Sequence, residues 1–302
     1  NQKYMQSITF ECEVITPMFL AGADGSTPEL RPPSIKGALR FWWRALNGHL
    51  ALGELKKRET AIFGGTDNGG GRSIIIIQAK PINTKTGVEI LIPHKNFMKA
   101  TAFKANETIF EVKLSLMKTV KDASNSFEIM NYERLKSLFL ITATLGGFGK
   151  RSRRGMGSVN IIKCSEQFKQ PNTLQEILPH LHQFSQFFEL YRNERIYNTY
   201  TGTLGLYGCL REVAIGEPEE KTETLLKHIS DTTHKEKEKD PYRYAASIGN
   251  AFGGRMASSV YVSIIKGSAL PIVSTLNIAV NRNSHHVSTL VQSSFVKEIL
   301  NK

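Results

Sequence analysis

The order of apolar periodicities in the first 165 residues constrains this fold more than any other feature of the chain. Segment 8–14 alternates apolar and polar residues, the period of two that is typical of a half-buried strand. The same reasoning predicts three more strands and two helices: strands at residues 74–77, 110–116 and 159–164, and helices at 34–50 and 127–145. The resulting order is β-α-β-β-α-β.

That order is typical of the split βαβ, or ferredoxin-like, sheet, whose usual strand order is 4-1-3-2. In this arrangement the fourth strand lies antiparallel beside the first, so its start adjoins the end of the first strand. The first helix begins where the first strand ends, and loop 146–157 leads into the fourth strand. We therefore expect segments 31–44 and 146–163 to meet at one edge of the sheet.

Positive charge is concentrated in the same part of the chain. The net charge is +12, and residues 1–165 hold 24 basic and 13 acidic residues against 15 and 14 in residues 166–302. Segments 31–44 and 146–163 contain several Lys and Arg residues and no Asp or Glu. Such a pattern is typical of a surface that binds phosphate backbones, although a solvated face that maintains solubility is the simpler alternative.

The first helix, which we expect Ser34 to cap, places its cations on one face. Lys36, Arg40 and Arg44 are i, i+4 neighbours, and no acid within the helix compensates them. Trp43 falls between this face and the apolar stripe, where it could stack on a base or shield the edge of the core. Gly37 leaves the cation side bare, which a close approach of a ligand or loop would explain.

The sequence of residues 146–157, GGFGKRSRRGMG, has five glycines and four cations in twelve residues. Glycine lets backbone amides approach an anion, and Lys and Arg neutralise it. A nucleotide-binding P-loop is excluded, because Arg151 follows Lys150 where Ser or Thr is required and because the loop follows a helix. Phe148 is either a stacking residue or an apolar anchor of the loop, and a flexible basic turn is the simpler alternative for the whole segment.

These two segments carry a resemblance to a known family. LRPPSIKGALRFWWRAL (30–46) and GGFGKRSRRGMGSV (146–159) resemble the RAMP superfamily of CRISPR-Cas proteins, and TPMFLAGAD (16–24) is similar to the family's start. The RFWWRAL extension resembles one branch, subunit one of the Cmr complex of type III-B systems. The resemblance implies an α+β fold of two tandem ferredoxin-like (RRM-like) RAMP domains, the second degenerate and with insertions.

We place the boundary of these domains at 1–166 and 167–302. Residues 252–260, which include Arg255, are similar to the glycine-rich loop without its basic insertion, as expected of an internal repeat. Further elements are predicted in the second half: a helix at 173–191, strands at 260–265 and 272–278, and a terminal helix at 287–300. The densely charged stretch 217–240 is expected to be a solvated helix or a mobile insertion.

The resemblance also implies the function: a non-catalytic, cytoplasmic subunit of antiviral defence that holds the 3′ part of the guide CRISPR RNA and helps to engage target RNA, beside other Cmr-complex RAMP subunits. We expect the following residues to bind RNA: Arg31, Ser34, Lys36, Gly37, Arg40, Trp43, Arg44, Gly146, Gly147, Phe148, Lys150, Arg151, Arg153, Arg154 and Arg255.

Two other classes of function remain open. Some RAMP relatives are metal-independent endoribonucleases that process CRISPR RNA with a histidine, but the eight histidines here form no convincing cluster in the sequence. A protein-only adaptor would dock its basic face on an acidic partner. No cofactor or metal site is predicted, the three cysteines are expected to be buried thiols, and no apolar run is long enough to span a membrane.

Overall fold

The computed structural model of the chain describes residues 5–65, 71–95, 97–202, 207–239, 257–267, 269–277 and 289–301. Its first half is built on an antiparallel four-stranded sheet of order β2-β5-β1-β8. The strands are β1 (Gln6–Val14), β2 (Ile75–Asn83), β5 (Ile109–Leu116) and β8 (Val159–Cys164). Since these are the first to fourth predicted strands, the predicted order 4-1-3-2 is confirmed.

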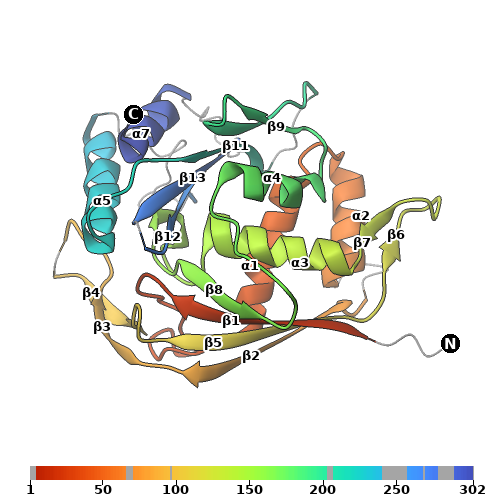
Figure 1. Cartoon of the computed structure of the whole chain (residues 1–302), viewed down its shortest axis with the longest axis horizontal. Coiled ribbons are helices and arrows are strands. Elements are labelled where there is room, and N and C mark those ends of the chain that lie inside the picture. Colours follow the sequence, from red (N-terminus) through yellow and green to blue (C-terminus); the bar gives the residue numbers. More distant parts are fainter. Residues whose placement is uncertain are drawn as a thin grey trace.

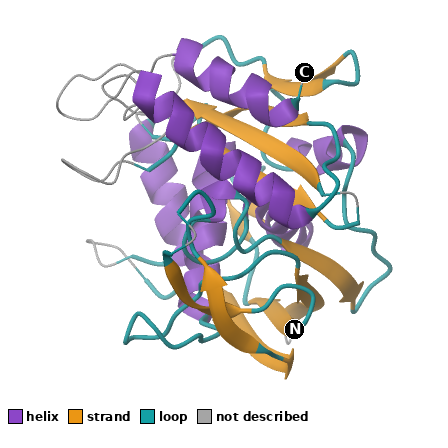
Figure 2. Cartoon of the chain, turned by 90° about the vertical axis from the view of Figure 1, so that its left-hand side faces the viewer, coloured by secondary structure: helices purple, strands orange, loops and turns teal. Residues whose placement is uncertain are grey.

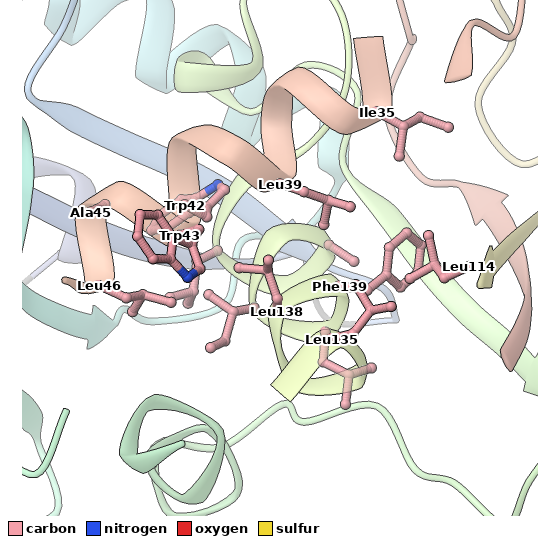
Figure 3. Packing of buried hydrophobic residues seen from close by; sticks show 14 of the residues in the cluster. Ile35, Leu39, Trp42, Trp43, Ala45, Leu46, Leu114, Leu135, Leu138 and Phe139 are labelled. Carbon is pink, nitrogen blue, oxygen red and sulfur yellow. The ribbon is translucent and has the colours of Figure 1, made fainter. Parts of the chain in front are cut away.

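Helices α1 (Pro32–Leu46) and α3 (Tyr132–Ile141) cover one face of this sheet, above it in Figure 1. The apolar stripe of α1 packs with residues of α3 and the sheet (Figure 3). A π-helical turn, Thr142–Gly146, continues α3. Helix α1 begins two residues earlier than predicted, with prolines in its first turn, and the residue at its N-cap is Arg31 rather than Ser34.

Three elements of the first half were not predicted. Helix α2 (Leu52–Phe63) follows α1, and two hairpins interrupt the basic pattern. The hairpins are formed by β3 (Thr86–Ile90) with β4 (Lys99–Phe103) and by β6 (Val120–Lys121) with β7 (Glu128–Met130). Helix α2 has buried residues at positions 55, 59, 62 and 63, a helical spacing that packs it beside α1.

The second half contains a five-stranded sheet of order β12-β13-β11-β10-β9. Its strands are β9 (Phe188–Tyr191), β10 (Arg195–Asn198), β11 (Cys209–Ile215), β12 (Val260–Ile265) and β13 (Leu270–Asn277). The predicted strands β12 and β13 are confirmed. Strands β9, β10 and β11 were missed, and β9 occupies the end of a segment that was predicted to be helical.

Helices α4 (Leu174–His182), α5 (Thr222–Lys239) and α7 (Thr289–Leu300) complete the second half, and Figure 2 shows helices packed against strands with the two chain ends far apart. The terminal helix was predicted correctly. Helix α5 is not purely solvated, because Leu225, Leu226 and Ile229 are buried in a second core cluster with α7 and β12. None of the described helices is both long and apolar enough to cross a membrane.

Candidate nucleic-acid interface

A groove of about 610 Å³ lies where α1 meets the glycine-rich loop. It is lined by residues of four segments, which we call together the α1 groove: residues 19–22 and 25, residues of α1 between 34 and 42, loop residues 147–150 and 152–153, and Tyr261 of β12. The two segments that carry the sequence pattern therefore lie side by side, as the strand order required. Tyr261 adds a contribution from the second half of the chain, which no pattern in the sequence predicts.

One face of α1 forms a wall of the α1 groove. Ser34, Gly37, Ala38 and Phe41 have the i, i+3, i+4, i+7 spacing of a single helix face, and all four line the groove. A Cβ atom at Gly37 would have no neighbouring atom within 4 Å. Glycine there keeps the groove open, since any larger side chain would project into empty space rather than into the core.

The glycine-rich loop forms the opposite wall, and its backbone conformation requires glycine. Gly147 and Gly149 have φ values of 134° and 90°, and a Cβ on Gly149 would lie 2.6 Å from the carbonyl oxygen of Phe19. The Lys150 N–H donates to that same carbonyl at 2.9 Å, and the Phe148 N–H donates to the Gly157 carbonyl at 2.9 Å. The loop is thus held against segment 17–20 rather than flexible, contrary to the simpler alternative.

Two arginines fasten this loop to the second half of the chain. The Arg154 guanidinium donates to the Ser258 hydroxyl at 2.9 Å and to the Val260 carbonyl at 3.1 Å, and its residue is 8% exposed. Arg153 donates to the Ser258 carbonyl. Arg154 is therefore a structural residue, and the prediction that it binds RNA is wrong because its charge is buried and hydrogen-bonded within the protein.

The α1 groove itself is positively charged. Lys150 is exposed, with its Nζ donating to the Gly25 carbonyl at 3.0 Å. The Arg153 guanidinium lies 4.6 Å from the ring centre of Tyr261 and 5.1 Å from that of Phe41, within the range of cation–π contacts. Among the described residues that line the groove none is Asp, Glu or His. An anion entering it would meet cations and aromatic rings.

The remaining cations of α1 have a partner that the sequence did not reveal. Arg40 forms an ion pair with Glu59 of α2, and the Arg44 Nε lies 3.5 Å from the same carboxylate. The Glu59 side chain is 8% exposed, whereas those of Arg40 and Arg44 are 39% and 41% exposed. No acid of α1 itself compensates this face, as predicted, but α2 supplies one carboxylate for two arginines.

For Trp43 and Phe148 the sequence analysis offered two roles each, stacking on a ligand or packing within the protein, and both side chains are buried. Trp43 is 1% exposed, lies against Phe63 of α2 with ring centres 6.2 Å apart, and is among the buried side chains in Figure 3. It has no accessible face on which a base could stack. Phe148 is 2% exposed and stacks on Phe139 at 6.4 Å, so it is the apolar anchor of the loop.

Lys36 keeps a partly exposed position, where burial and the neighbouring Arg40 lower the pKa of its ammonium group. Arg31 lies at the N-terminus of α1, and Arg151 has a left-handed backbone with φ of 61° at the loop. Gly146 lets the π-helical turn approach α1, since a Cβ there would lie 2.5 Å from Trp42 Nε1. Arg255 and most of the repeat 252–260 lie outside the described residues.

The structure pairs two histidines that are 140 residues apart. The rings of His94 and His234 stack with centres 4.8 Å apart, and His94 Nδ1 lies 2.7 Å from the Ser230 hydroxyl. Burial, followed by the charge of His234, lowers the pKa of His94. Neither histidine lines the α1 groove. Within the described ranges no group of three or more His, Cys, Asp or Glu side chains could hold a metal ion.

Cysteine chemistry does not contribute to this site. All three cysteines are free thiols; Cys12 and Cys209 are buried as predicted, and Cys164 is partly exposed. Burial raises the pKa of the Cys12 thiol, so that it stays protonated in the core.

Comparisons with known proteins place these features in context. A family model described as the RAMP superfamily matches residues 11–160. The chain is 32% identical over 188 residues to the CRISPR system Cmr subunit Cmr1-2 of Pyrococcus furiosus, which covers 54% of this chain and 98% of that protein. It is 31% identical over 169 residues to Cmr1-1 of the same organism, which covers 52% of this chain and 48% of that protein.

Solved structures show the same fold at lower identity. The crystal structure of Cmr1 from Pyrococcus furiosus in its apo form is similar with a TM-score of 0.62 at 20% identity, covering 98% of this chain and 96% of that one. The cryo-EM structure of a type III-B Cmr-beta complex bound to cognate target RNA contains a chain with a TM-score of 0.54 at 12% identity, covering 98% of this chain and 100% of that one.

Proposed function

The chain belongs to the RAMP superfamily as a Cmr1-like member, and on that premise we propose that it is a non-catalytic, RNA-binding subunit of a type III-B Cmr effector complex. In this proposal it acts in the cytoplasm in antiviral defence, holds guide RNA toward its 3′ end, helps to capture target RNA and contacts other RAMP subunits of the complex. The observation that carries the proposal is the α1 groove, an open, cationic groove lined by the two RAMP-like segments.

The chemistry of the α1 groove favours a polynucleotide over other anions. Lys150 and Arg153 can neutralise phosphates, and the partly exposed Phe41 presents a ring beside them. Backbone contacts of this kind carry no base specificity, which suits a subunit that must accept guides of any sequence. Of the predicted residues, we propose that Ser34, Gly37, Gly147, Lys150 and Arg153 contact RNA directly, and that the partly exposed Lys36, Arg40, Arg44 and Arg151 lie at the rim.

We also propose that the two halves are tandem ferredoxin-like domains with a boundary near residue 166. In the second half, β11, β12 and β13 take the positions of strands one, two and three in the sheet order β12-β13-β11-β10. Strand β10 then occupies the position of the fourth strand, although it precedes the other three in the chain. Helices α5 and α7 follow β11 and β13, as the two helices of such a domain do.

A substitution that fills the α1 groove without disturbing the core tests this proposal. Gly37→Leu places a side chain in the open space of the groove, and it is expected to stabilise α1 because glycine costs about 1 kcal/mol relative to a good helix former. We expect the variant to keep its thermal stability and to lose at least tenfold in affinity for single-stranded RNA, measured by fluorescence anisotropy at 50 mM salt.

Gly53→Leu is the matched control, since a Cβ at Gly53 in α2 also has no neighbour within 4 Å and Gly53 does not line the groove. Equal RNA affinities for Gly37→Leu, Gly53→Leu and the unmodified protein would refute binding in the groove. A protein that binds an acidic polypeptide but no RNA would be an adaptor instead.

A further inference from the structure

A second basic surface lies on α2. A cleft of about 1030 Å³, which we call the α2 cleft, is formed by the outer face of α2, segment 71–74 and segment 117–121. In Figure 1 the elements that border it, α2 and β6, lie beside each other at the right edge of the molecule. Among the described residues that line the cleft, none is Asp or Glu. Five are cations: Lys56, Lys57, Arg72, Lys118 and Lys121.

These cations differ from those of the first helix in having no internal partner. Within the residues that the structure describes, none of the five forms an ion pair, and all five are exposed. Two nearby carboxylates among the described residues are engaged elsewhere: Glu54 pairs with Arg58 at 2.6 Å. Asp122 accepts hydrogen bonds from Ser124, Ser126 and Phe127 in its own turn. Within the described part of the chain, the cleft therefore concentrates uncompensated positive charge.

The α2 cleft is separate from the α1 groove. No residue lines both, and α2 faces α1 with its buried side, on which Phe63 contacts Trp43 and Glu59 contacts Arg40. The cations of the cleft lie on the outer side of α2, at positions 56 and 57, on the loops that hold Arg72 and Lys118, and on β6 at Lys121. A ligand in the cleft thus contacts none of the residues that resemble the RAMP segments.

The composition of the cleft matches a phosphate backbone better than a protein partner. Besides the cations it offers the hydroxyl groups of Thr60 and Thr119, which can donate to phosphate or sugar oxygens, whereas the Ser73 hydroxyl already donates to backbone carbonyls. No aromatic side chain lines it among the described residues, whereas protein interfaces depend on buried aromatic and aliphatic anchors. The apolar residues of its described lining are Ala61, Ile74, Met117 and Val120, of which Met117 is 44% exposed.

We propose that the α2 cleft is a second binding site for the phosphate backbone of RNA. The inference extends the proposed RNA-binding function to a surface that the α1 groove does not include. It follows from the positive charge of three separate segments that the fold brings together, with no ion pair to any of the five cations among the described residues. Lysines and arginines held in this way bind RNA of any sequence, with an affinity that falls steeply as salt rises.

The triple variant Lys56→Gln, Lys57→Gln, Lys121→Gln tests the proposal in the intact chain. If three phosphates lose their partners, the slope of log affinity against log salt for a single-stranded RNA of mixed sequence should become shallower by about 2, since each contact contributes about 0.7. At 0.1 M salt that corresponds to a loss of about 100-fold in affinity. All three side chains are exposed, so thermal melting should show an unchanged fold.

A control variant with the same change in net charge distinguishes the loss of a local binding site from a general effect of lowering the charge of the protein. Lys99→Gln, Lys221→Gln, Lys235→Gln removes three exposed lysines outside both the cleft and the groove, and it should change the slope by less than 0.5. Equal slopes for the cleft variant and the control would overturn the inference. It would also be overturned if poly-glutamate bound tightly to the cleft while the cleft variant kept its full RNA affinity.

The Gly37→Leu variant and the cleft variant together distinguish RNA binding in the α2 cleft from RNA binding in the α1 groove. If Gly37→Leu abolishes RNA binding and the cleft variant matches its control, the groove stands and the cleft is refuted. If the cleft variant loses affinity and Gly37→Leu does not, the second site stands and the groove is refuted.

Discussion

Glu59 controls how much of the positive charge of α1 reaches a ligand. Its carboxylate is buried and pairs with both Arg40 and Arg44, whose side chains are 39% and 41% exposed. Two cations and one anion leave a net charge of +1 on this face of the helix. Glu59→Gln removes the negative charge while preserving the size of the side chain, so it should double the net charge that the two arginines present.

The magnitude follows from counterion release. One more uncompensated cation beside a single-stranded RNA should steepen the slope of log affinity against log salt by about 0.7, which at 0.1 M salt is a gain of about fivefold in affinity. The variant should at the same time lose about 1 to 2 kcal/mol of unfolding free energy. That cost lies between the values for buried and for exposed ion pairs, because the two arginines are partly exposed.

Fluorescence anisotropy over 50 to 400 mM salt and thermal melting measure the two effects on the same sample. Glu212→Gln is the matched control, since Glu212 pairs with Arg195 at 2.7 Å with side-chain exposures of 19% and 33%. It should lose comparable stability and leave the slope unchanged. An unchanged slope and affinity in Glu59→Gln would show that Arg40 and Arg44 do not face RNA, and the cationic face of α1 would have to be removed from the proposed site.

Three further predictions use other buried side chains. Trp43→Ala should lower the free energy of unfolding, measured with denaturant, by about 3 to 5 kcal/mol and leave the RNA affinity of the folded protein unchanged, because Trp43 lies in the core. A selective loss of affinity at unchanged stability would contradict its burial. Arg154→Met should speed tryptic cleavage within residues 146–157 several-fold, since it releases the contacts to Ser258 and Val260; equal digestion rates would argue against that anchoring. Burial lowers the pKa of His180, so its protonation favours the unfolded chain, and stability should fall as pH drops below the ordinary value of 6.5. His180→Phe should flatten this part of the profile of melting temperature against pH. An unaltered profile would refute the role assigned to His180.

Much of the first half could be predicted because its elements are identified by short sequence patterns and its strand neighbours by the order of those elements along the chain. Alternation in 8–14 located β1, and the glycines at 146 and 147 located the end of the helical segment. The order of elements then dictated which strands are neighbours, and from that the meeting of α1 with the glycine-rich loop followed without any pairwise contact being known.

Two of the errors at the site come from helix α2, which the sequence analysis did not predict. Its buried positions 55, 59, 62 and 63 follow a helical spacing, and recognising it would have placed a carboxylate beside Arg40 and a ring beside Trp43. The error at Arg154 is different, because its partners, Ser258 and Val260, lie about 100 residues further along the chain, just before and at the start of β12. No local pattern reports such a contact, since a buried arginine and a ligand-binding arginine have the same sequence signature.

The attachment of Arg153 and Arg154 to Ser258 and Val260 has a consequence for any shortened form of the protein. A piece ending near residue 166 would retain every strand of the first sheet, yet its cationic turn would lack the residues that fix its shape. The two guanidinium groups would then become solvent-accessible and lose their internal acceptors. Such a piece would expose more positive charge to a polyanion, whereas the 302-residue chain restricts which of its charges a ligand can reach.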